Sequence, residues 1–380
     1  MVFWGIRRQR KTERAGCRVR AEKTSRLLDR RSFQVIRDFL MEYCDKPFVS
    51  GFEQMTPRLL PGYFAPYSDT YENDRRGSYI FCSKGSASRS IMLEAHVDEL
   101  GFMITELLPG GFLRFSPVGY YNTLCLEAQD IIIYGKKEVA GVICARPDKP
   151  QPEKEIINLR TDWLYIDTGL SDGELEALVQ PGDVALLRRK PVILDGDIIC
   201  ARGLDDKAGV AVMLAAAREL EHLPHTSTIY YSAAVQEEGP GLGGQIATYQ
   251  IHPDIAFAFD VGHGWTEDLP RDEMLRVGGG PALAIGGRFH PGMVRKFIAV
   301  CEKFGIPYQL EPTPAASGTD AESIQTNRDG VPVLLISIPL RYMHTGVETG
   351  SVSDIENIGK AVAHMISEID RENWEGLLCY

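Results

Sequence analysis

Two adjacent carboxylates, Glu237 and Glu238, stand in the segment Gln236-Glu237-Glu238-Gly239, directly after an apolar run. That run, residues 228–235, is rich in β-branched and aromatic residues and predicts a buried strand. Two carboxylates at the end of a buried strand repel each other, so the pair favours a place where positive charge lies beside it. No Lys or Arg is near in sequence, which makes a metal ion the simplest counter-charge. The plainer alternative is that one glutamate caps the next helix and the other is solvated.

Other side chains of metal-binding type follow other predicted strands. His96 follows one apolar run, Asp260 ends a second, and His344 comes shortly after a third. Asp205 opens a predicted helix, where the positive end of the helix dipole favours an anion. Each residue alone has an ordinary explanation, such as a helix cap or a hydrogen-bonded histidine. Because ligands bind beyond the carboxyl ends of parallel strands, the set predicts one site. The three strands are predicted over residues 90–95, 254–259 and 331–338.

This inventory suits a particular chemistry. Mixed histidine and carboxylate ligands favour zinc, cobalt or manganese over calcium or a thiolate-bound metal. Five ligands can serve two ions if one carboxylate bridges them, and Asp205 is the predicted bridge. Two ions about 3.5–4 Å apart would lower the pKa of a shared water towards about 7, and one glutamate of the pair would then accept its proton. Asp98 is predicted to accept a hydrogen bond from the second ring nitrogen of His96 and so to orient the imidazole.

The strands that carry these residues alternate with predicted helices. Order is expected to begin near Ser32, where apolar residues recur at helical spacing. Further helices are expected over residues 207–223, 293–304 and 352–371. Apolar strands that alternate with helices predict an α/β fold, in which helices flank a mostly parallel central sheet.

Residues 103–195 have a different character. Short β-like runs recur there between turns that contain Gly and Pro. This pattern predicts an inserted β-rich domain with the form of a small barrel. The segment contains no catalytic cluster of its own. The predicted organisation is therefore a catalytic α/β domain over residues 32–102 and 196–380, the insert, and a basic, poorly ordered extension over residues 1–31.

The composition restricts the class of function. The chain has 380 residues, 44% of them hydrophobic, and a net charge of −11. The first 31 residues carry eleven Lys/Arg and three Asp/Glu, so the remainder carries −19. An acidic body argues against nucleic acid as a partner. The eight cysteines are scattered singly, which favours free thiols in a reducing compartment. No apolar run approaches the roughly 18 residues that a membrane span needs.

Five motifs together resemble those of the M42 family of metallo-aminopeptidases, in order and in spacing. The resemblance covers roughly residues 32–371, and the combination is far more specific than any one motif. The motifs are AHVDELGF at residues 95–102, LDDK at 204–207, VQEEG at 235–239, SGTDA at 317–321 and PLRYMHT at 339–345.

The resemblance implies two catalytic metal ions, zinc or cobalt. It implies that His96 and Asp260 bind one ion, that Glu238 and His344 bind the other, and that Asp205 bridges the two. The protein is then expected to be an aminopeptidase that removes N-terminal amino acids from short peptides.

The resemblance also implies that Glu237 is the general base and that residues 103–195 are the family's dimerisation domain. Members commonly assemble from dimers into a hollow tetrahedral dodecamer and act in the cytoplasm. The chain departs from the family at Lys207, where the usual residue is Arg, and we expect this change to be tolerated. It also departs at Val261–Trp265, which includes His263, and that difference bears on the substrate preference.

Two alternatives remain open at this point. A glycoside hydrolase of the endoglucanase type would use Glu237 with another carboxylate, but it would not need His96 and His344. A non-catalytic scaffold would use its metal ions only to hold the fold, so that metal loss would unfold it.

Overall fold

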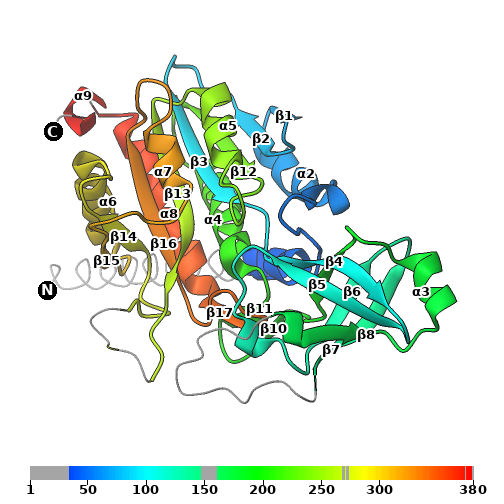
Figure 1. The fold of residues 1–380 in the computed structure, drawn as a ribbon. Helices are drawn as coiled ribbons and strands as arrows, with labels where there is room; N and C mark the ends of the chain where they lie inside the picture. Colours follow the sequence, from blue (N-terminus) through cyan, green and yellow to red (C-terminus); the bar gives the residue numbers. More distant parts are fainter. Residues whose placement is uncertain (1–33, 147–160, 268–269, 271–273, 373, 379–380) are drawn as a thin grey trace, which may run out of the picture.

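The computed structural model describes residues 34–146, 161–267, 270, 274–372 and 374–378. The basic segment 1–31 and residues 147–160 of the predicted insert therefore lie outside the described residues. At the centre is an eight-stranded sheet (Figure 1). Its strands, in spatial order, are β1 (Thr70–Asn73), β2 (Tyr79–Ser83), β12 (Thr228–Ala234), β3 (Ser90–His96), β13 (Ile255–His263), β16 (Val333–Leu340), β14 (Ala282–Ile285) and β15 (Gln309–Pro312).

The four middle strands of this sheet are parallel. β12 pairs with β3, β3 with β13, and β13 with β16, all in the parallel sense. β2 and β14 flank this group in the antiparallel sense, and β1 and β15 form the two edges. The parallel group matters for function, because its strands end at one edge of the sheet.

Helices cover both faces of the sheet. One face packs against α4 (Leu204–Leu220), α6 (Pro291–Phe304) and α8 (Val352–Ile369), and the other against α5 (Gly243–Ile251) and α7 (Ala321–Gln325). Successive residues of a strand point to opposite faces, so Leu93 joins the larger core and Met92 the smaller one. The described chain opens with the helical residues 34–43, and the remaining described helices are short: η1 (Glu53–Met55), α2 (Leu59–Phe64), η2 (Ala65–Tyr67), η3 (Thr123–Cys125), η4 (Thr161–Trp163), α3 (Asp172–Leu178) and α9 (Trp374–Leu378).

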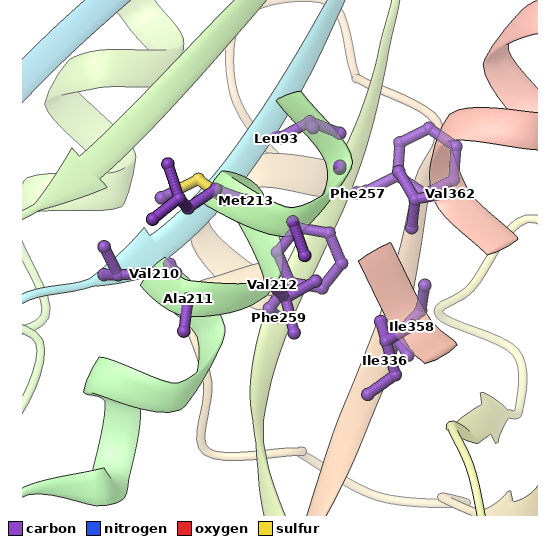
Figure 2. Close-up of a cluster of buried hydrophobic side chains, with 14 of the residues drawn as sticks. Leu93, Val210, Ala211, Val212, Met213, Phe257, Phe259, Ile336, Ile358 and Val362 are labelled. Atoms are coloured by element: carbon purple, nitrogen blue, oxygen red, sulfur yellow. The ribbon is translucent and has the colours of Figure 1, made fainter. Parts of the chain in front are cut away.

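The larger core lies between the sheet and the helices α4 and α8. Figure 2 shows strand residues such as Phe257, Phe259 and Ile336 beside helix residues. Burial of one such side chain contributes about 1.5–3 kcal/mol to folding. Gly359 of α8 allows the two helices to approach closely, because a Cβ atom there would lie 2.5 Å from the Cβ of Ala215. This packing holds α4, which carries Asp205 near its N-terminal end, against the sheet.

The inserted region forms a closed six-stranded barrel with its own hydrophobic core. A small third sheet lies between the barrel and the main sheet (Figure 1). The predicted fold class, a helix-flanked and mostly parallel sheet with an inserted small barrel, is therefore confirmed. The barrel strands in order are β4 (Gly101–Leu108), β5 (Phe112–Val118), β8 (Leu164–Asp167), β7 (Glu138–Ala145), β6 (Asp130–Tyr134) and β9 (Val184–Leu187); the small sheet holds β10 (Val192–Ile193), β11 (Ile198–Ala201) and β17 (Glu348–Ser351).

No helix in the described part of the chain combines the length and the apolar character that crossing a bilayer requires.

Asp354 ties the first turn of α8 to the segment 278–280. Its Oδ2 accepts a hydrogen bond from the backbone N–H of Gly278, and its Oδ1 accepts one from Gly280, both at 2.7 Å. Burial raises the pKa of this carboxyl from 3.8 to about 6. Because the folded-state pKa lies above the unfolded one, the carboxyl contributes stability that is fully present below about pH 3.8 and is lost as the pH rises through about 6.

We therefore expect Asp354→Asn to flatten part of the pH dependence of stability. Relative to the variant, the wild type should lose up to about 3 kcal/mol of unfolding free energy between about pH 4 and pH 7. Urea unfolding of both proteins at several pH values measures this difference, with the exposed Asp195→Asn as a matched control for charge. Parallel pH profiles for the wild type and the Asp354 variant would contradict the assignment.

Candidate metal centre

His96 and Asp260 lie at the carboxyl edge of the parallel strands. His96 is the last residue of β3, and Asp260 lies in the neighbouring strand β13. Both side chains are almost fully buried. Together with Asp205, they offer ligand atoms that all lie within 4.8 Å of one another.

Asp205 approaches the same place from the start of α4. Its backbone and that of Asp206 are not helical, so the regular helix begins only at Lys207. The peptide bond between the two aspartates is cis. Asp205 Oδ1 lies 3.2 Å from His96 Nε2, and Asp205 Oδ2 lies 3.4 Å from His344 Nε2. The two oxygens of one carboxylate thus face two histidines.

A second group forms around the other oxygen of this carboxylate. Ligand atoms of Asp205, Glu238 and His344 also lie within 4.8 Å of one another. His344 Nε2 is 3.8 Å from Glu238 Oε2. Among the described residues, no hydrogen-bond partner reaches the buried Oε1 atom of Glu238. Each group offers a histidine, a second carboxylate and a share of Asp205, a donor set that fits one divalent ion per group.

The electrostatics of the cluster also favour cations. Burial raises the pKa values of Glu238 and Asp260 well above their usual range, and the Asp205 charge raises both further. Although burial favours the neutral acid at Asp205, hydrogen bonds from His344 and His96 hold its pKa below the usual value. Crowded, buried carboxylates are costly unless positive charge compensates them. Two divalent ions would supply that charge.

Glu237 lies beside the two groups rather than in either of them. Its Oε2 atom is 3.9 Å from His96 Nε2, and its side chain is 16% exposed. Burial raises the pKa of Glu237 to about 7. The carboxylate therefore stands next to the cluster with access to solvent, a placement suited to proton transfer.

Asp98 makes contacts that reach further than the sequence indicated. The Nδ1 atom of His96 lies 3.1 Å from the backbone carbonyl oxygen of Asp98 and 3.6 Å from its Oδ1. The Asp98 carboxylate accepts the backbone N–H of Glu237 at 3.0 Å and that of Glu238 at 3.1 Å. One buried aspartate therefore contacts the imidazole and holds the backbone of the glutamate pair.

Glu348, a residue that sequence reasoning missed, fixes two ligands through their backbones. Its Oε2 accepts the N–H of Asp205 at 3.2 Å, and its Oε1 accepts the N–H of His344 at 3.0 Å. The side chain is buried. The only sequence signal is an acidic residue shortly after His344, which alone would not distinguish Glu348 from a surface glutamate.

Glu99 was also missed as a structural residue, and it explains how Lys207 is accommodated. Glu99 is buried and pairs with Arg202, while its Oε1 lies 2.8 Å from Lys207 Nζ. The Lys207 ammonium also donates to the backbone oxygen of Lys46 at 3.2 Å and lies over the ring of Phe48. Although burial disfavours the charge, the two cations hold the pKa of Glu99 below its usual value. Lys207 thus supports the fold next to the cluster.

Two other residues of interest from the sequence lie outside both ligand groups. His263 ends β13 and is exposed, and Asp320 lies at the start of α7. Asp320 is buried near Glu94 of β3, burial raises the pKa of both carboxyl groups, and Asp320 raises the pKa of Glu94 further. Neither His263 nor Asp320 belongs to the two groups of possible ligands found in the described part of the chain.

A helix-flanked sheet with a histidine–carboxylate cluster at its carboxyl edge and an inserted barrel defines a protein of the metallopeptidase class. A protein-family model described as "M42 glutamyl aminopeptidase" matches residues 77–360. The chain therefore belongs to the M42 peptidase family, as the five motifs predicted. It is an aminopeptidase, an enzyme that hydrolyses peptides.

Individual relatives agree with this assignment. The chain is 30% identical over 338 residues to the lysyl aminopeptidase of Pyrococcus furiosus, covering 87% of this chain and 97% of that protein. A TET aminopeptidase from a marine sediment archaeon of the Thaumarchaeota superposes with a TM-score of 0.82 at 27% identity, covering 90% and 98%. The TET1 peptidase of Pyrococcus horikoshii, described as able to assemble into a tetrahedron or a large octahedral shell, superposes with a TM-score of 0.75 at 27% identity, covering 87% and 99%.

Proposed function

We propose that this aminopeptidase works with two divalent metal ions, zinc or cobalt. His96 and Asp260 would hold one ion, Glu238 and His344 the other, and Asp205 would bridge them. One observation supports this above all: the two carboxylate oxygens of Asp205 face two different histidines, at 3.2 and 3.4 Å. A carboxylate that belongs to both groups of possible ligands is what a shared site requires.

The chain's own residues divide the chemistry between them. When bound, the ions supply positive charge that lowers the pKa of a nearby water and polarises the peptide carbonyl. Glu237 Oε2 accepts the proton of the attacking water and then returns it to the nitrogen of the leaving peptide. Asp98 keeps the two glutamates in place through their backbone N–H groups.

We also propose the organisation of the working enzyme. The catalytic domain comprises residues 32–102 and 196–380, and the dimerisation domain comprises residues 103–195. Two chains pair through this second domain, and the resulting dimers assemble into a dodecamer. The superposition with the TET1 peptidase, which can assemble into a tetrahedron or a large octahedral shell, supports this proposal. Cytoplasmic action is supported by the cysteines, since the six that the structure describes are all free. Light scattering after size-exclusion chromatography measures the oligomer, and a monomer at all concentrations would contradict the assembly.

Metal removal tests the proposed function directly. We expect dialysis against a chelator to lower hydrolysis of aminoacyl p-nitroanilides by at least about 10²-fold, and zinc or cobalt to restore it. The folded state should survive, which circular dichroism would verify.

Three outcomes separate the proposal from its alternatives. Peptidase activity that persists after complete metal removal would exclude metal dependence. Release of sugar from a β-glucan without metal would favour a glycoside hydrolase. Unfolding on metal loss, without peptidase activity in the loaded protein, would favour a scaffold.

A further inference from the structure

Three consecutive backbone N–H groups, those of residues 236–238, are held by two buried carboxylates. Asp98 accepts the N–H groups of Glu237 and Glu238. Glu53 Oε1 accepts the N–H of Gln236 at 3.0 Å, although the two residues are 183 positions apart in sequence. A segment near the start of the described chain thus reaches the backbone next to the glutamate pair.

Gln236 has an unusual backbone that needs this support. Its φ is +61°, in the left-handed region that residues other than glycine disfavour. Because Gln236 directly precedes Glu237, its φ determines the direction in which both glutamates leave β12. Arg76 Nη2 donates to the Gln236 side-chain oxygen, but this contact is exposed. Among the described side chains, Glu53 is the carboxylate that holds the main chain at Gln236.

Glu53 is itself anchored to the loop that carries Asp98. Its Oε1 also accepts the N–H of Gly51 at 2.9 Å. Val49 forms a β-bridge with Glu99, and the N–H of Ser50 donates to the Glu99 backbone oxygen at 3.1 Å. Residues 49–53 therefore join the loop after β3 to the loop after β12.

Glu53 is a costly residue for a purely structural role. Its side chain is 1% exposed, and no hydrogen-bond partner reaches its Oε2 among the described residues. A buried carboxylate oxygen without a partner destabilises the folded state. An apolar side chain would avoid that cost but would offer no acceptor to the N–H groups of Gly51 and Gln236, so the oxygen atom Oε1 is what this position supplies.

We propose that Glu53 is a positioning residue, which fixes the left-handed backbone at Gln236 and thereby aims Glu237 at the reacting water. The proposal rests on the proposed function of Glu237. It does not require Glu53 to touch substrate or metal. The role depends on the length of the side chain (its reach) rather than on its charge, because one oxygen atom accepts the N–H groups of both Gly51 and Gln236.

Three substitutions in the full-length, metal-loaded enzyme separate reach from charge. Glu53→Gln keeps an oxygen at the same reach, so kcat should stay within about threefold of wild type. Glu53→Asp keeps the charge but shortens the side chain, and Glu53→Ala removes the acceptor. Both should lower kcat by about 10–100-fold with KM within about threefold, because the base is displaced and binding is not. Gln54→Ala, on the exposed side of the same turn, is the matched control.

Hydrogen–deuterium exchange of a peptide that spans residues 235–239 gives a readout independent of activity. Exchange should accelerate by at least about tenfold in Glu53→Asp and Glu53→Ala, and should match wild type in Glu53→Gln and Gln54→Ala. If Glu53→Ala does not fold, the Asp and Gln variants decide the question. Wild-type exchange and kcat in Glu53→Asp, or a loss of kcat in Glu53→Gln, would overturn the proposal. An inactive wild type would instead overturn the proposed function, while the exchange data would still show whether Glu53 holds the backbone at Gln236.

Discussion

Glu237→Gln will lower kcat for aminoacyl p-nitroanilides by about 10²–10⁴-fold, with the metal content of the wild type retained. Glu237 lies beside both groups of possible ligands and belongs to neither. Glutamine fills almost the same space and still accepts a hydrogen bond, but it cannot take a proton from water. The backbone N–H of residue 237 will still donate to Asp98. The loss should therefore be chemical, with KM little changed.

The neighbouring glutamate provides the matched control. Glu238 contributes ligand atoms to the second group, so Glu238→Gln should lower the metal content measured by elemental analysis. Glu237→Gln should leave that content at the wild-type value. If Glu237→Gln retained wild-type kcat, or if it lost metal as Glu238→Gln does, Glu237 would not be the base. Stable circular dichroism in both variants would exclude unfolding as the cause.

The location of the cluster was predictable from the sequence because it depends on strand ends. Runs of apolar residues identify buried strands, and parallel strands end at the same edge of a sheet. This reasoning predicts that His96 and Asp260 lie close together, and their ligand atoms do lie within 4.8 Å. It also predicts that the apolar run before Glu237 is a strand, which is β12.

The residues that hold the cluster were not predictable in the same way. Glu53 and Glu348 act on backbone N–H groups of other segments, and one of these contacts spans 183 positions. No local spacing encodes such a contact, because any polar side chain near a turn can accept a backbone N–H. The start of α4 was also harder to place, since Asp205 and Asp206 are not helical although they belong to the same element. The local helix propensity is overridden there, because Asp205 lies between two histidines.

The proposed bridging role of Asp205 leads to the second large effect. Asp205→Ala should remove ligand atoms from both groups at once, whereas Asp260→Ala and His344→Ala each remove them from one. Loss of a hydrogen-bond partner of a metal ligand already lowers metal affinity by about 10–100-fold. Loss of a shared ligand should therefore lower the affinity for each ion by at least about 10²-fold. Titration of the metal-free protein with cobalt, followed by its absorption and by calorimetry, measures both affinities.

The stoichiometry across the three variants distinguishes a bridge from an ordinary ligand. Asp260→Ala and His344→Ala should each retain one tight ion, and Asp205→Ala should retain none. Asp205→Ala also leaves His96 without a carboxylate that raises its pKa, so the pKa of His96 should fall, and NMR titration of the metal-free protein should detect the change. One tight ion remaining in Asp205→Ala would mean that a single group carries the metal unaided. In that case the two groups would be separate sites, and the carboxylate between them would orient the histidines rather than join two ions.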